Sequence, residues 1–244
     1  MTFARPFVAA AVVSALSGPA AAIVGDSRDG DAFVDRVVMV LSRGSGREGV
    51  CTGVAIAPRV VLTAAHCLAG ASDTLIAVRI HGKTEPVRVA SIARHPGYDP
   101  EAPRKRRVSI DVGLVETAEP LPEGFRLSEL SDDATALGAP VTVVGFGLRS
   151  ENGPPSDGHA RAADLVVGEP VSKIVLWARD PGHAGLGACH GDSGGPMFSE
   201  DNRVVAVVAW TNGENGHGCG AVTQGPRVAP VKGWIASVRS KWGR

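Results

Sequence analysis

Short apolar runs rich in β-branched residues recur along the chain between turn residues. Gly, Pro, Asn or Asp bounds most of these runs, and this spacing favours short β-strands over helices. The runs are Val37–Leu41, Val54–Ile56, Val60–Leu62, Leu75–Ile80, Val87–Ile92, Val141–Val144, Leu165–Val167, Ile174–Trp177 and Val204–Trp210. The pattern is typical of an antiparallel all-β sandwich or barrel.

Helical spacing is found only near the end of the chain. Apolar residues there repeat at intervals of three or four, after Pro230: Trp234, Ile235, Val238 and Trp242. This spacing predicts an amphipathic helix over 231–242 that docks on the rest of the protein. Two other stretches, Pro100–Arg107 and Arg149–His159, are rich in turn residues or basic residues, and we expect them to be surface loops.

Composition excludes some classes of protein. The chain has 244 residues, of which 44% are hydrophobic, and its formal net charge is zero. It can therefore bury a sizeable core, and its overall charge gives no reason to expect nucleic acid or acidic lipid as a partner. Length alone does not decide between one domain and two.

The first 22 residues have the features of a secretory signal peptide. Arg5 supplies a positive charge, Phe7–Leu16 is apolar but too short to span a membrane, and Ala20–Ala22 fits a signal peptidase site. The alternative is a buried N-terminal strand. We expect a secreted mature chain of residues 23–244 that begins at Ile23 and has no membrane anchor.

Four cysteines are present: Cys51, Cys67, Cys189 and Cys219. Because export exposes a chain to an oxidising compartment, disulfides are expected. Three pairings are possible, and the pattern alone does not choose among them. Zinc is the competing interpretation, but the sequence lacks a Cys-x-x-Cys motif.

Three side chains are candidates for nucleophilic catalysis. Ser193 stands in Gly191-Asp192-Ser193-Gly194-Gly195-Pro196, where Gly191 can adopt backbone angles that let its N–H and that of Ser193 face one oxyanion. A serine needs a base and a group that orients the base. His66 follows an apolar strand, and Asp111 is an acid within an apolar run that needs a partner if buried. Gly-x-Ser-x-Gly alone also occurs in α/β-hydrolases, so an esterase of that class is an alternative.

Together these motifs resemble those of the chymotrypsin/trypsin-like serine peptidases, in the same order along the chain. The three matching segments are Thr63-Ala64-Ala65-His66-Cys67, Asp111-Val112-Gly113-Leu114 and Gly191 to Pro196. Further similarities are Val144-Gly145-Phe146-Gly147, His95-Pro96-Gly97-Tyr98 and Trp234-Ile235. The resemblance covers residues 23–244. It implies two six-stranded antiparallel β-barrels, roughly 23–130 and 131–230, with the active site between them and the C-terminal helix after them.

The resemblance also assigns roles to individual residues. It implies disulfides Cys51–Cys67 and Cys189–Cys219, an oxyanion hole at Gly191 and Ser193, and an ion pair between the freed amine of Ile23 and Asp192. The predicted signal cleavage lies directly before Ile23. We therefore expect that export itself activates the enzyme without a separate zymogen stage.

Specificity is expected to depend on Gly187, Trp210 and Thr211. Trypsin-like members have an aspartate where this chain has Gly187, so cleavage after basic residues is disfavoured. Thr211 replaces a common glycine and is expected to narrow the pocket, which favours small or medium apolar residues at P1, the residue whose carbonyl is attacked. The segment 212–218 is longer than usual, and Ala209 replaces a serine that supports the aspartate in relatives.

The expected function is thus a secreted, monomeric serine endopeptidase that acts on protein or peptide substrates. No cofactor is implied, and Asp73 and Glu85 alone are too few ligands for a calcium site. The non-enzymatic alternative is a protease-like binding protein. Such proteins usually lose a catalytic residue, whereas all three candidates are present here.

Overall fold

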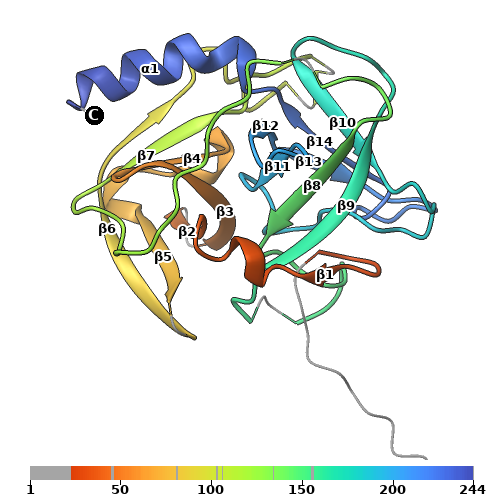
Figure 1. The fold of residues 1–244 in the computed structure, drawn as a ribbon, viewed down its shortest axis with the longest axis horizontal. Coiled ribbons are helices and arrows are strands. Elements are labelled where there is room, and N and C mark those ends of the chain that lie inside the picture. Colours follow the sequence, from red (N-terminus) through yellow and green to blue (C-terminus); the bar gives the residue numbers. More distant parts are fainter. Residues whose placement is uncertain are drawn as a thin grey trace, which may run out of the picture.

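The structure is a computed structural model that describes residues 23–44, 47–80, 82–102, 104–105, 107–133, 135–154 and 157–243. The predicted signal peptide, residues 1–22, lies outside the described residues. Strands dominate the described chain, and short 3-10 helices interrupt it at η1 (Asp31–Phe33), η2 (Ala65–Cys67), η3 (Ala71–Asp73) and η4 (Ala229–Val231). Figure 1 shows the strands gathered into two groups that lie side by side.

The first group is a closed antiparallel barrel in the order β2-β3-β4-β7-β6-β5. Its strands bury their apolar side chains in the interior, as the short β-branched runs predict. The bounds are β2 Val37–Gly44, β3 Arg47–Ala57, β4 Val60–Thr63, β5 Thr74–Ile80, β6 Lys83–Arg94 and β7 Gly113–Thr117.

The second group is an antiparallel sheet in the order β12-β11-β8-β9-β10-β14-β13, and β1 (Arg28–Asp29) is paired with β9. Its end strand β12 returns to the segment after β14, through a bridge between Ala206 and Arg227. The sheet therefore has eight strands where six were expected. The bounds are β8 Pro140–Gly145, β9 Arg161–Gly168, β10 Val175–Arg179, β11 Pro196–Phe198, β12 Val204–Val207, β13 Trp210–Asn212 and β14 Val222–Pro226.

One predicted strand, Val204–Trp210, is divided into β12 and β13. The backbone changes partners between them, because Val208 N–H donates to Gly195 O at 2.8 Å and Ala209 N–H donates to Gln224 O at 2.9 Å. This change of partner places Trp210 on a different part of the sheet from Val207. The additional strand therefore reflects tertiary pairing rather than a break in apolar character.

The C-terminal helix α1 spans Lys232–Lys241, close to the predicted 231–242. Ile235 and Val238 are buried, and both belong to the same core cluster as the interior of the first barrel. The Trp234 ring meets the His95 ring edge-on at 5.0 Å between centroids. The helix therefore covers the first barrel, beside which it lies in Figure 1. Within the described residues, no helix is both long and apolar enough to span a bilayer.

Candidate active site

His66 lies in the short helix η2, directly after strand β4. Backbone hydrogen bonds from Cys67 N–H to Ala64 O and from Leu68 N–H to Ala65 O, both 3.2 Å, form this turn. The strand before it is fully buried in the barrel wall, and at this turn the chain leaves that wall. The His66 side chain is 35% exposed and is therefore accessible to a substrate.

Asp111 precedes β7 and holds His66 at two points. Its Oδ1 accepts the His66 backbone N–H at 2.9 Å, and its Oδ2 lies 2.6 Å from His66 Nδ1. A carboxylate facing Nδ1 fixes the ring proton on that nitrogen and leaves Nε2 free to accept a proton. The Asp111 side chain is only 14% exposed, so its position is well shielded from solvent.

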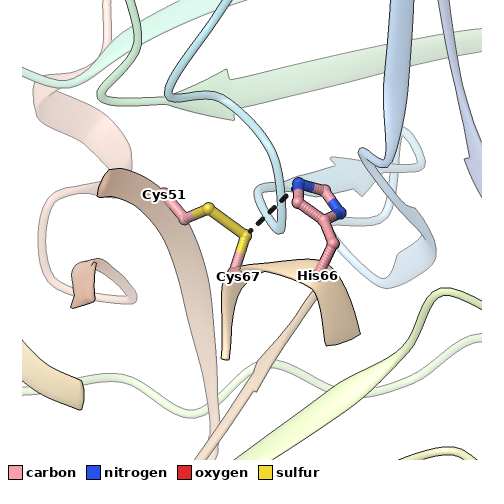
Figure 2. Close-up of side chains that lie close together, drawn as sticks. All are labelled: Cys51, His66 and Cys67. Carbon is pink, nitrogen blue, oxygen red and sulfur yellow. Dashed lines mark hydrogen bonds between the residues drawn. A yellow bond between two sulfur atoms is a disulfide. The ribbon is translucent and has the colours of Figure 1, made fainter. Parts of the chain in front are cut away.

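The backbone of Ser193 lies against the segment that carries His66. Thr52 N–H donates to Ser193 O at 2.7 Å, and Cys67 Sγ is 3.6 Å from the same oxygen. That sulfur is also 3.7 Å from His66 Nε2, and Figure 2 shows the imidazole beside it. The backbone carbonyl oxygen of Ser193 and Nε2 of His66 therefore both lie next to Cys67 Sγ.

Two glycines beside Ser193 have positive φ, and for Gly191 the sequence suggested such backbone angles. Gly191 has φ +99°, and a Cβ there would lie 2.7 Å from Gly147 Cα. Gly194 has φ +83°, and a Cβ there would collide with Thr63 Oγ1 and Thr52 O. Only glycine fits either position without displacing backbone or buried side chains.

Two backbone N–H groups of this segment remain available. Asp192, Gly194 and Gly195 N–H each donate to a backbone carbonyl. In the described part of the chain, the N–H groups of Gly191 and Ser193 donate to no protein acceptor. A pair of free, preorganised donors next to a serine is the arrangement that can stabilise an oxyanion.

Asp192 is fully buried, and its side chain lies against the backbone of Gly147 and Cys189. Its Oδ1 accepts Gly147 N–H and its Oδ2 accepts Cys189 N–H, both at 2.8 Å. Burial raises the pKa of Asp192 to about 7, although these two hydrogen bonds act in the opposite direction. A buried carboxylate in this state gains stability from a cationic partner.

Both predicted disulfides are present. Cys51 is bonded to Cys67 and Cys189 to Cys219, with Cα atoms 6.1 Å and 4.8 Å apart. Cys51, His66 and Cys67 also cluster at metal-ligand spacing, as Figure 2 shows. Because their sulfurs are joined, the two cysteines offer no thiolates, so the zinc interpretation of these cysteines is wrong.

The three predicted specificity residues are not all in one place. Gly187 is buried, and a Cβ there would lie 2.8 Å from Gly220 O. Thr211 Oγ1 donates to Gly218 O at 2.6 Å, so Gly187 and Thr211 both border the segment 218–220. Trp210 is 46% exposed and lines a cavity of about 380 Å³ that also reaches Asp111 and Ala209.

Sequence reasoning missed Thr52, which joins the serine segment to the first barrel. Its buried Oγ1 donates to Gly191 O at 2.9 Å and accepts Phe146 N–H at 3.0 Å. Thr52 O in turn accepts a hydrogen bond from Thr63 Oγ1 at 2.7 Å. A threonine between a cysteine and a glycine carries no motif that could have revealed these contacts.

Comparisons with known proteins show which family this chain resembles. The family model described as Trypsin matches residues 23–235. Serine protease 56 of Mus musculus is 30% identical over 215 residues, which are 76% of this chain and 34% of that protein. This chain thus spans about a third of the mouse relative's length.

Other relatives match over most of their own length. A trypsin of Saccharopolyspora erythraea is 30% identical over 181 residues, 67% of this chain and 76% of that protein. Trypsin alpha-4 of Lucilia cuprina is 30% identical over 215 residues, 78% of each chain. Among solved structures, neuropsin, a serine protease of mouse brain, superposes with a TM-score of 0.72 at 18% identity, covering 87% of this chain and 98% of that one.

The fold and the matched sequence define the class of protein. The chain belongs to the trypsin family and is a serine endopeptidase with the double-barrel fold of that family. Such hydrolases act on protein or peptide substrates. An α/β-hydrolase needs a parallel sheet, whereas the strands here are paired antiparallel, so the esterase alternative is excluded.

Proposed function

We propose that His66, Asp111 and Ser193 form the catalytic triad of a secreted endopeptidase that cleaves after small or medium apolar residues. The two-point hydrogen bonding of Asp111 to His66 carries the proposal, because it leaves Nε2 as the base. In this mechanism Ser193 Oγ attacks the substrate carbonyl while His66 Nε2 takes its proton. The same nitrogen then gives that proton to the leaving amine, and an acyl-enzyme remains on Ser193.

The oxyanion formed in this step is assigned to the N–H groups of Gly191 and Ser193. Both are free among the described residues, and the φ of Gly191 and the hydrogen bond from Thr52 Oγ1 to Gly191 O fix the Gly191 backbone. Water then attacks the acyl-enzyme with His66 again acting as the base. A fluorophosphonate that labels the processed protein tests this function, whereas absence of labelling would favour a protease-like binding protein.

Gly187, at the position that the family resemblance assigns to the P1 pocket, supports an apolar P1 residue. Trypsin-like members have an aspartate where this chain has Gly187, and a side chain there would collide with the Gly220 backbone. No carboxylate at this position is available to pair with lysine or arginine. We expect a peptide-library digest to show cleavage after small or medium apolar residues, with basic P1 residues disfavoured by about 10- to 100-fold in kcat/KM. Dominant cleavage after Arg or Lys would contradict this assignment.

Activation is proposed to follow signal cleavage between Ala22 and Ile23. Ile23 is fully buried in the core of the second sheet, and Val24 is paired with Gly187 through backbone bonds of 3.1 and 3.2 Å. The freed amine would then supply the cation that buried Asp192 requires. Secretion and the disulfides fit the same oxidising compartment.

The pH dependence of Asp192 gives this proposal a measurable sign. With Ile23 still in peptide linkage, the pKa of Asp192 is raised to about 7. Its protonated form therefore stabilises the folded state. This contribution is fully present below the unfolded pKa of ~4 and is lost as the pH rises through about 7. After cleavage the ion pair should hold until the amine loses its proton near ~8. Edman sequencing of the secreted protein should read Ile-Val-Gly, and activity should decline above that pH.

A chain with one extra glycine before Ile23 provides the control for this prediction. Its amine is displaced from Asp192, so it should fold but retain little activity. A secreted, active protein that begins at another residue would refute activation at Ile23.

A further inference from the structure

The turn after β13 has a shape fixed by its own backbone. Gly213 N–H donates to His217 O at 2.8 Å, and His217 N–H donates to Glu214 O at 3.0 Å. The two central residues of the tighter turn, Asn215 and Gly216, have φ of 54° and 85°. Positive φ at both central positions is what a type I′ turn requires. Segment 212–218 is therefore a loop with a defined backbone shape. A contact from another part of the chain can shift this loop as a unit.

Glu151 makes such a contact from a surface loop 67 residues away. Its Oε1 accepts Gly218 N–H at 2.8 Å, and its Oε2 lies 3.3 Å from His217 Nδ1. The Glu151 side chain is 28% exposed, whereas His217 is 67% exposed. The carboxylate thus holds the last two residues of the turn at once.

The same turn borders the residues assigned to the P1 pocket. Gly218 O accepts Thr211 Oγ1 at 2.6 Å, so the Gly218 residue is held by Glu151 at its nitrogen and by Thr211 at its oxygen. Cys219 comes next and is bonded to Cys189. Gly220 then packs against Gly187, where its oxygen would lie 2.8 Å from an added Cβ.

We propose that Glu151 is a positioning residue for substrate specificity, acting through Gly218 on the Thr211 side of the P1 pocket. The inference rests on the proposed function and deepens it. By fixing Gly218, Glu151 keeps the Thr211 hydroxyl turned toward the segment 218–220 and the pocket narrow. The enzyme therefore favours small P1 side chains over large ones.

The backbone contact to Gly218, rather than the contact with His217, carries this effect. His217 is mostly exposed, and polar contacts between exposed side chains contribute little to stability. The bond from Gly218 N–H to a carboxylate is charge-assisted and partly buried, and it has a defined direction. A glutamine at position 151 keeps a side-chain oxygen for Gly218 N–H but removes the charge. It should therefore preserve specificity, whereas alanine should not.

The test compares Glu151→Ala and Glu151→Gln with the unchanged enzyme on peptides that differ only at P1, from Ala to Val, Leu and Phe. In Glu151→Ala we expect the ratio of kcat/KM for Leu over Ala to rise about five- to tenfold, through KM, as the loss of one hydrogen bond implies. The rate of labelling by a small fluorophosphonate should stay within about twofold, since the triad is untouched. Glu151→Gln should restore most of the original ratio.

Glu214→Ala is the matched control, because it removes an acid from the same turn while keeping the Glu214 carbonyl that accepts His217 N–H. Its P1 ratio should be unchanged. An unchanged ratio in Glu151→Ala would overturn the inference, and so would a loss shared equally by all substrates with slower labelling. If the unchanged, correctly processed protein neither labels nor cleaves, the proposed function fails and the inference fails with it.

Discussion

Replacing Ser193 with alanine is expected to abolish both peptide hydrolysis and covalent labelling. In the proposed mechanism its hydroxyl oxygen forms the acyl-enzyme, so a side chain without that oxygen can form none. We expect kcat to fall by about 10⁶-fold, the size of effect associated with loss of a serine nucleophile. Turnover of a peptide ester and fluorophosphonate labelling, both measured on protein processed to Ile23, give the two readouts.

Ser199→Ala is the control for this experiment. Ser199 lies six residues further on, where its Oγ donates to Asp201 Oδ1 at 2.5 Å in the turn after β11. Its loss should leave activity within about twofold. If Ser193→Ala retained labelling, the nucleophile would be another residue. If both variants lost activity with their unfolding midpoints lowered, the cause would be instability rather than chemistry.

Replacing Asp111 with asparagine should leave the fold intact but lower kcat by about 10⁴-fold, the magnitude associated with a wrong tautomer in Ser-His-Asp triads. The amide cannot hold the proton on His66 Nδ1 as the carboxylate does across 2.6 Å. His66 Nε2 would then carry the proton and could not accept one from Ser193. Steady-state kinetics over a pH range and thermal unfolding of the same samples measure the two parts of this prediction.

Asp99→Asn is a suitable comparison, because Asp99 lies in the preceding loop and accepts Glu101 N–H at 2.9 Å, away from the imidazole. We expect its activity to stay within about twofold. Retention of a tenth or more of the activity in Asp111→Asn would show that Asp111 does not set the tautomer of His66.

Strands with continuous β-branched character could be predicted from the sequence, as Val60–Leu62 and Leu75–Ile80 show. Strands defined mainly by their partners could not. Pro196–Phe198 is short and begins with proline, and Val222–Pro226 contains a glycine and a glutamine, so neither has a local strand pattern. Arg28–Asp29 forms a strand only because it pairs with β9. Tertiary pairing decides such segments.

For the candidate site, local motifs predicted His66, Asp111 and Ser193, and the family resemblance implied the two disulfides that the structure contains. The contacts of Thr52 and Glu151 could not be foreseen, because each joins segments far apart in the chain. Thr52 Oγ1 reaches Gly191 across 139 residues, and Glu151 reaches Gly218 across 67. A motif records which residues are neighbours in sequence. It does not record which buried hydroxyl or surface carboxylate supports them from another strand or loop.

The two ends of the described chain are exchanged between the halves of the molecule. The N-terminal strand β1 adds to the second sheet, whereas the C-terminal helix α1 packs on the first barrel. Phe33 stacks on Phe198 between them, with ring centroids 5.4 Å apart. Each half therefore packs against a segment that is continuous in sequence with the other half. We therefore expect the halves to melt in a single cooperative transition, so that the candidate active site keeps its shape until the whole protein unfolds.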